Sequence, residues 1–87
     1  MKIAVFDTYV RRPDGSRMHF DILVNDEGKD IGIVLSHGRR YLAAKGLAPD
    51  ALTASECSFC HSEPGNPQIE AEILKEGFAI IEMENCH

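Results

Sequence analysis

Residues 2–24 read KIAVFDTYVRRPDGSRMHFDILV and set the architecture of the chain. Residues 2–10 are rich in β-branched and aromatic side chains, and residues 17–24 alternate between two kinds of position, as in a half-buried strand. Between them, residues 12–16 carry Pro, Asp and Gly, which favour a tight turn. The sequence therefore predicts an antiparallel β-hairpin.

The turn also predicts which residues face one another across the hairpin. With residues 14–15 at the tip, Thr8 lies opposite Asp21 and Val10 lies opposite His19. A slip of one residue would reassign which residues share a face. In this register the core side consists of Ile3, Val5, Tyr9, Met18, Phe20, Ile22 and Val24, with Asp7 at the same face.

The other face of the hairpin is mixed in character. It consists of Ala4, Phe6, Thr8, Val10, His19, Asp21 and Leu23. Because Phe6, Val10 and Leu23 are apolar, we expect a homodimer contact on this face. The alternative is that these are scattered apolar surface residues, which are normal and need no partner.

Two helices and two more strands follow the hairpin. Apolar residues at helical spacing predict a helix that begins after the acids of residues 25–28 and ends before Gly46. A short strand is expected over residues 52–55. Asn66 can cap a second helix, which Gly77 ends, and residues 78–83 form the last strand.

The element order is strand, strand, helix, strand, helix, strand within one domain, residues 1–87. The last three elements form a crossover, which predicts that the final two strands run parallel. We therefore predict a two-layer α+β fold, with a mixed four-stranded sheet and both helices on one face.

Composition excludes several classes of function. The 87 residues include 9 Lys and Arg against 14 Asp and Glu, a net charge of −5. We therefore expect no nucleic-acid partner and no membrane partner, because both rely on clustered positive charge or on a long apolar run. The first residues do not resemble a secretory signal, so a cytoplasmic location is expected.

The segment CSFCH, residues 57–61, is the one short motif with recognised chemistry. Two residues between cysteines is a spacing that serves metal ions. We predict a zinc-binding module on Cys57, Cys60 and Cys86, the last folding back from the end of the chain. The fourth ligand is a histidine, taken from His61, His87 and His19.

Three other interpretations of this motif stay open. Cys57 and Cys60 could form a reversible disulfide in a thiol redox protein, although nearby acids would raise the pKa of both thiols. The spacing also matches covalent haem attachment, which normally occurs outside the cytoplasm. Finally, the thiols could be small buried apolar groups with no chemical role. A separate hypothesis for the whole chain is a non-enzymatic interaction module that uses the mixed face of the sheet.

His19 and Asp21 are a second candidate pair, since residues two apart on a strand share a face. A carboxylate beside an imidazole can serve as a general base or as a metal ligand with its supporting group. More often such a pair is a surface hydrogen bond. Asp7, within the apolar first strand, is expected to have a structural role.

Four blocks of the chain together resemble a small bacterial family, the domain of unknown function numbered twenty twenty-four. These blocks are DTYV at 7–10, MHFDI at 18–22, ASECSFCHSE at 54–63 and GFAIIEMENC at 77–86. The resemblance implies a compact α+β domain and no established reaction, substrate or cofactor. Its motif positions are Asp7, Thr8, Tyr9, His19, Phe20, Asp21, Cys57, Phe59, Cys60, His61 and Cys86.

Overall fold

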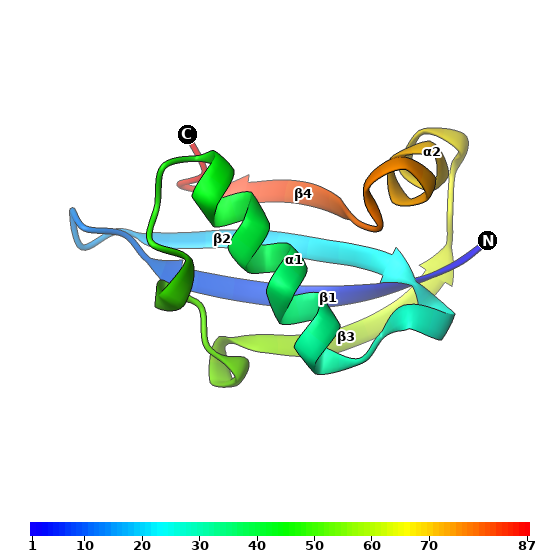
Figure 1. The fold of residues 1–87 in the computed structure, drawn as a ribbon, viewed down its shortest axis with the longest axis horizontal. Helices are drawn as coiled ribbons and strands as arrows, with labels where there is room; N and C mark the ends of the chain where they lie inside the picture. The colour runs from blue at the N-terminus through cyan, green and yellow to red at the C-terminus, as the bar shows by residue number, and fades with distance from the viewer.

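The computed structural model describes all 87 residues and has the α+β class that the sequence predicts (Figure 1). Its helices and strands follow the predicted order. They are β1 (Lys2–Arg11), β2 (Arg17–Asn25), α1 (Ile31–Ala44), β3 (Cys57–Pro64), α2 (Pro67–Glu76) and β4 (Ala79–Glu84). Short 3₁₀ turns occupy Asp26–Gly28, Pro49–Ala51 and Ala54–Glu56. No helix is both long and apolar enough to cross a membrane.

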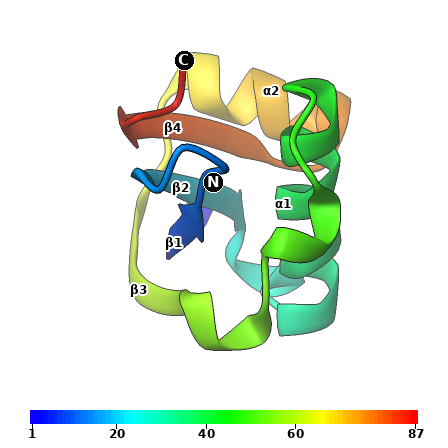
Figure 2. The same ribbon diagram turned by 90° about the vertical axis from the view of Figure 1, so that its left-hand side faces the viewer.

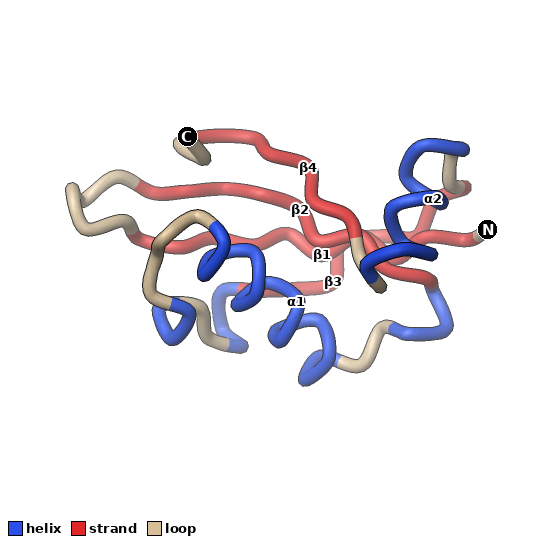
Figure 3. Tube along the Cα trace, turned by 45° about the horizontal axis from the view of Figure 1, so that its top comes forward, coloured by secondary structure: helices blue, strands red, loops and turns tan.

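The sheet has the strand order β3-β1-β2-β4 (Figure 3). Every neighbouring pair is antiparallel. The predicted mixed sheet with two parallel strands is therefore wrong. The reason is that the last two strands, β3 and β4, join opposite edges of the hairpin. Because β3 pairs with β1 and β4 pairs with β2, the chain crosses through α2 from one sheet edge to the other, and no parallel pair forms.

The hairpin turn is one residue longer than the two-residue tip that the sequence analysis assumed. Gly15 donates its backbone N–H to the carbonyl of Arg12 at 2.9 Å, and Arg12 donates to the carbonyl of Ser16 at 2.8 Å. Gly15 has φ +87°, in the left-handed region. This is a three-residue loop, Pro13 to Gly15, in which a turn is followed by a left-handed glycine that forms a bulge.

The extra residue shifts the register by one position. Asp7 lies opposite Asp21 and Tyr9 lies opposite His19, whereas the sequence predicts Thr8 opposite Asp21. A slip of one residue moves every side chain of a strand to the other face. The predicted faces of β1 are therefore exchanged, while those of β2 are correct.

The main core lies between α1 and one face of the sheet. It holds Ala4, Phe6, Val10, Met18, Phe20, Ile22, Val24, Val34, Leu35, Leu42, Leu52, Cys57 and Cys86. Helix α1 approaches closely at Gly38, where an added Cβ would lie 2.5 Å from Leu52 and 2.9 Å from Ile22. Phe6 and Val10 are thus interior residues, so their predicted place on an outer face is wrong, while dimerisation itself stays a prediction.

A second, smaller apolar cluster lies on the opposite face of the sheet. Helix α2 contributes Ile73, which packs with Ile3, Val5, Leu23 and Ala79. The prediction that both helices cover one face is therefore wrong. In the view along the strands, α1 lies beside the sheet, while α2 lies across its far end near β4 (Figure 2).

The ends of α2 are where the sequence places them. The Asn66 side chain accepts a hydrogen bond from the backbone N–H of Ile69 at 2.9 Å, and Gly77 ends the helix with φ +90°. The strand predicted over residues 52–55 is wrong, because Leu52 is buried under α1 and a 3₁₀ turn follows it. Pairing with β1 begins only at Cys57.

Candidate functional site

The face opposite α1 has two halves of different character. The covered half consists of Ile3, Val5 and Leu23, which pack beneath Ile73 of α2. The open half continues along the same two strands and consists of Asp7, Tyr9, His19 and Asp21. Because alternate residues of a strand share a face, the covered and open halves form one continuous surface.

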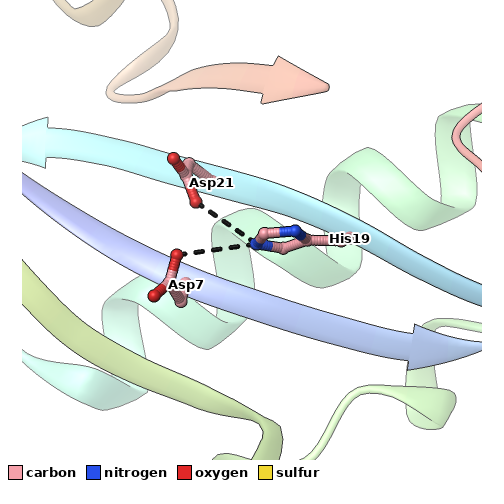
Figure 4. A group of neighbouring side chains, drawn as sticks. All are labelled: Asp7, His19 and Asp21. Atoms are coloured by element: carbon pink, nitrogen blue, oxygen red, sulfur yellow. Dashed lines mark ion pairs between the residues drawn. The ribbon is translucent and has the colours of Figure 1, made fainter. Parts of the chain in front are cut away.

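Three side chains of the open half converge. Asp7 on β1 and Asp21 on β2 are directly opposite one another, and His19 projects from β2 toward both (Figure 4). The Nε2 atom of His19 lies 3.5 Å from Oδ1 of Asp7 and 3.8 Å from Oδ1 of Asp21. Like charges directly opposite each other destabilise a sheet, so the carboxylate pair is unexpected in a purely structural strand pair.

The cluster is partly buried, and two of its polar atoms make no hydrogen bond. Asp21 is only 8% exposed, and its Oδ1 atom and His19 Nε2 are buried without a hydrogen bond. Desolvation, together with the neighbouring Asp7, raises the pKa of Asp21 to about 6. Hydrogen bonding with Asp21 lowers the pKa of Asp7. Buried polar atoms are nearly always hydrogen-bonded, so these two are exceptions in the sheet.

Aromatic stacking fixes the orientation of the histidine. The imidazole of His19 stacks on the ring of Tyr9, with centroids 4.3 Å apart and planes inclined by 15°. The guanidinium of Arg17 lies over the same Tyr9 ring, 4.0 Å from its centroid. The Tyr9 ring is therefore shared by the imidazole and the guanidinium, and its stacking restrains the imidazole whose Nε2 faces the carboxylates.

The three ligating atoms have the spacing that a metal ion requires. One atom each from Asp7, His19 and Asp21 all lie within 4.8 Å of one another. Two ligands at about 2.1 Å from a tetrahedral ion are about 3.4 Å apart, close to the two distances measured from His19. Carboxylate oxygens and imidazole nitrogens are both common metal ligands.

The structure does not bring together the residues predicted to bind zinc. Cys57 is buried in the main core beside Thr8, whose hydroxyl lies 3.5 Å from its sulfur. Cys86 is also buried, and its thiol donates to the carbonyl of His19 at 3.2 Å. Strands β1 and β2 lie between β3, which carries Cys57, and β4, which precedes Cys86, and the three interstrand spacings amount to about 14 Å. Of the predicted ligands, only His19 belongs to the cluster with Asp7 and Asp21.

The two cysteines of the CSFCH motif are not placed to form a disulfide. Both belong to β3, where each residue advances the chain by about 3.3 Å, so Cα atoms three residues apart are separated by roughly 10 Å. A disulfide needs a separation of about 4.4–6.8 Å. Cys57 points into the core, whereas Cys60 is exposed on the face of Asp7. A disulfide between them would require β3 to rearrange.

Cys60 and His61 border the cluster from β3. The sulfur of Cys60 lies 3.2 Å from Nδ1 of His61, and Nε2 of His61 lies 2.8 Å from Oε1 of Glu63. From the sequence, His19 and Asp21 are paired on one face, whereas Asp7 is expected to have a structural role and is not joined to them. The signal that could have grouped them is the Pro13 to Gly15 loop, because a three-residue loop sets Asp7 opposite Asp21.

Comparisons with known proteins agree on the fold and leave the activity open. The NMR structure of protein NE1680 from Nitrosomonas europaea, a target of the Northeast Structural Genomics Consortium, is similar over 100% of both chains, with a TM-score of 0.88 and 34% sequence identity. No match is found among curated proteins. The model of the domain of unknown function DUF2024 matches residues 1–83. The chain therefore belongs to the DUF2024 family.

Proposed function

We propose that this protein binds a divalent metal ion through Asp7, His19 and Asp21. The observation that carries the proposal is the pair of buried atoms without a hydrogen bond, His19 Nε2 and Asp21 Oδ1, which lie 3.8 Å apart. An ion placed there would satisfy both atoms and would offset the repulsion between the opposed carboxylates. None of Cys57, Cys60 and Cys86 is a ligand in this proposed site.

The ligand set favours an ion of intermediate hardness. Imidazole suits Zn²⁺ and similar transition metals, and carboxylates suit Mn²⁺ and Mg²⁺. One imidazole with two carboxylates therefore favours Zn²⁺ or Mn²⁺ over Ca²⁺, which takes six to eight oxygen ligands. We name Zn²⁺ as the first ion to test, because the distances of 3.5 and 3.8 Å are near those of a tetrahedral site.

One side of the proposed metal site is open to solvent. Asp7 exposes 39% of its side chain and His19 exposes 19%, so one side of the cluster faces solvent. Three protein ligands leave at least one coordination position for water or for a bound molecule, which is the arrangement of catalytic rather than purely structural zinc sites. The proposed site is therefore one that exchanges ligands.

A second candidate function, acid–base chemistry without a metal, is favoured by the opposite pKa shifts of the two carboxyls. Burial and Asp7 raise the pKa of Asp21 to about 6, while hydrogen bonding with Asp21 lowers the pKa of Asp7. Paired carboxyls whose pKa values diverge are a common arrangement of a general acid beside an ionised base. This function predicts no dependence on bound metal, which separates it from the first proposal.

The test measures binding of Zn²⁺ and of Mn²⁺ by calorimetry on chelator-treated protein. The His19→Gln and Asp21→Asn variants keep side-chain size while removing a ligand, and we expect each to weaken binding at least tenfold. Asp50→Asn is the matched control, because Asp50 lies in an exposed turn and outside the cluster. Circular dichroism checks that each variant is folded.

Two results would count against the proposal. One is a folded wild-type protein that binds neither ion at millimolar concentration. The other is binding that Asp50→Asn weakens as much as Asp21→Asn does, since this would indicate a diffuse effect of negative charge. A chelator-insensitive activity that Asp21→Asn abolishes would favour the acid–base function instead.

A further inference from the structure

A bulge in β4 brings an acidic side chain beside the histidine of the open half. The register between β2 and β4 shifts at this point, so that His19 pairs with Glu84 rather than with Met83. A bulge places two residues of one strand opposite one residue of its partner and re-aims their side chains. In a regular strand Glu84 would lie opposite Met18, which belongs to the main core. The bulge therefore moves Glu84 to the face of His19.

The residue after Glu84 ties this end of β4 to the hairpin. Asn85 has φ 55°, in the left-handed region, which Asn adopts more readily than most residues. Its side-chain amide donates to the carbonyl of Arg17 at 2.7 Å, and its own carbonyl accepts from the guanidinium of Arg12 at 2.6 Å. These contacts fix the end of β4 beside the start of β2.

The guanidinium of Arg17 is oriented but has no ion-pair partner. It lies over the ring of Tyr9, 4.0 Å from the ring centroid. Stacking on an aromatic face leaves the N–H groups at the edge of a guanidinium free to donate. None of them makes an ion pair or a hydrogen bond within the chain, although acidic residues outnumber basic ones by 14 to 9. A carboxylate is a group that such a planar fork binds through two parallel hydrogen bonds.

Arg17 and Glu84 face one pocket and do not pair with each other. The pocket has a volume of about 250 Å³ and is lined by Tyr9, Arg17, His19 and Glu84. Its walls therefore carry one positive and one negative charge beside the stacked rings of Tyr9 and His19. A pocket below about 300 Å³ suits a ligand smaller than a typical drug molecule.

We propose that this pocket binds a small aminocarboxylic acid in its zwitterionic form, such as a free amino acid. The ligand carboxylate binds Arg17 and its ammonium binds Glu84, so each charge of the ligand meets an opposite charge that the chain leaves unpaired. An anion without an ammonium, such as inorganic phosphate, places a like charge before Glu84. Both side chains are exposed and keep much of their hydration, so the expected affinity is millimolar. The pocket rests on its own geometry and requires no bound metal, although His19 belongs to both sites.

The experiment is an NMR titration of chelator-treated protein with glycine and with γ-aminobutyrate, which hold their two charges at a short and at a longer separation. We expect at least one of them to saturate at millimolar concentration and to shift the backbone amides of His19 and Glu84. Acetate and methylamine each carry one of the two charges of glycine and should bind at least tenfold more weakly than the better zwitterion. Arg17→Gln and Glu84→Gln should each weaken binding of that zwitterion at least tenfold.

Matched variants separate this inference from the proposed function. Lys75→Gln and Asp50→Asn are the controls for Arg17→Gln and Glu84→Gln, because each removes a charge of the same sign from an exposed position outside the pocket. Arg17→Gln should keep Zn²⁺ affinity within threefold of the wild type, since Arg17 is not among the proposed metal ligands. A wild type that binds Zn²⁺ but neither zwitterion overturns the pocket and leaves the metal site intact, and the reverse result does the opposite.

Two further results would overturn the pocket. One is zwitterion binding that the two control variants weaken as much as Arg17→Gln and Glu84→Gln do, because the effect would then be one of net charge. The other is acetate that binds as tightly as the better zwitterion, because Glu84 would then have no part in recognition.

Discussion

The covered and open halves of the sheet face opposite α1 use the same two strands for different purposes. In the covered half, Leu23 is 6% exposed and packs with Ile73 of α2. Two residues earlier on the same strand face, Asp21 is 8% exposed and has a carboxylate oxygen without a hydrogen bond. Equal burial thus stabilises the fold in one half and costs free energy in the other. A costly group that the fold retains marks a functional site more clearly than a residue type alone.

The largest difference between the halves should be seen with Leu23→Ala. Removing this side chain leaves a cavity beneath α2, and buried leucine-to-alanine changes cost about 2–4 kcal/mol. We expect the free energy of unfolding, measured by urea denaturation, to fall by that amount. Metal affinity of the folded protein should change less than threefold. A loss below about 0.5 kcal/mol would show that α2 does not bury this half in solution.

In the open half, the next largest effect should come from the stack that orients His19. Tyr9→Leu removes the aromatic plane 4.3 Å from the imidazole, and we expect Zn²⁺ affinity to fall about tenfold, as for other supporting groups of metal ligands. Tyr9→Phe keeps the stack and should bind as the wild type does. Equal losses in both variants would assign the effect to the phenol hydroxyl instead.

The register explains why the sequence predicted the strands but not the site. The sequence pairs His19 with Asp21, but a two-residue tip sets Thr8 opposite Asp21 and places Asp7 on the other face. Turn residues such as Pro13 and Gly15 fit two-residue and three-residue loops alike, and only the hydrogen bonds distinguish them. One position along the chain was enough to separate the members of the cluster.

The helix caps and the cysteine motif show that the sequence predicts local structure well and context-dependent structure poorly. Asn66 and Gly77 act locally, so the sequence placed both ends of α2 correctly. The spacing of Cys57 and Cys60 has no fixed meaning until the local structure is known. In a turn or helix it would bring the sulfurs together, but in β3 it separates them. Sheet order is equally nonlocal, because it depends on which edge each late strand joins.

A third prediction is that a substitution in the open half raises the stability of the metal-free protein. Burial and Asp7 raise the pKa of Asp21 from 3.8 to about 6, so the folded chain holds a proton that the unfolded chain releases. The stability that this proton supplies is present below about pH 4 and is lost as the pH rises through 6. Asp21→Asn is neutral throughout, so we expect it to stabilise the metal-free protein by about 1 kcal/mol at pH 7.5.

The same gain should vanish near pH 3.5, where Asp21 is protonated in both states. Thermal unfolding in the presence of a chelator measures both conditions, with Asp50→Asn as the control. Added Zn²⁺ should reverse the order at pH 7.5, because the ion stabilises only the chain that binds it. A variant that is less stable than the wild type at pH 7.5 without metal would indicate that the Asp21 carboxylate is fully satisfied.

The smallest effect should come from the ion pair that joins α2 to α1. Arg40 contacts the carboxylate of Glu76, but both side chains are largely exposed, and such pairs contribute about 0–1 kcal/mol. We expect Glu76→Gln to change the free energy of unfolding by less than about 0.5 kcal/mol, whereas Ile73→Val should cost about 1 kcal/mol by removing a single buried methylene. Urea denaturation in low and high salt measures both. If Glu76→Gln lowered the free energy of unfolding more than Ile73→Val does, the ion pair rather than apolar burial would be the main contact that holds α2 on the covered half.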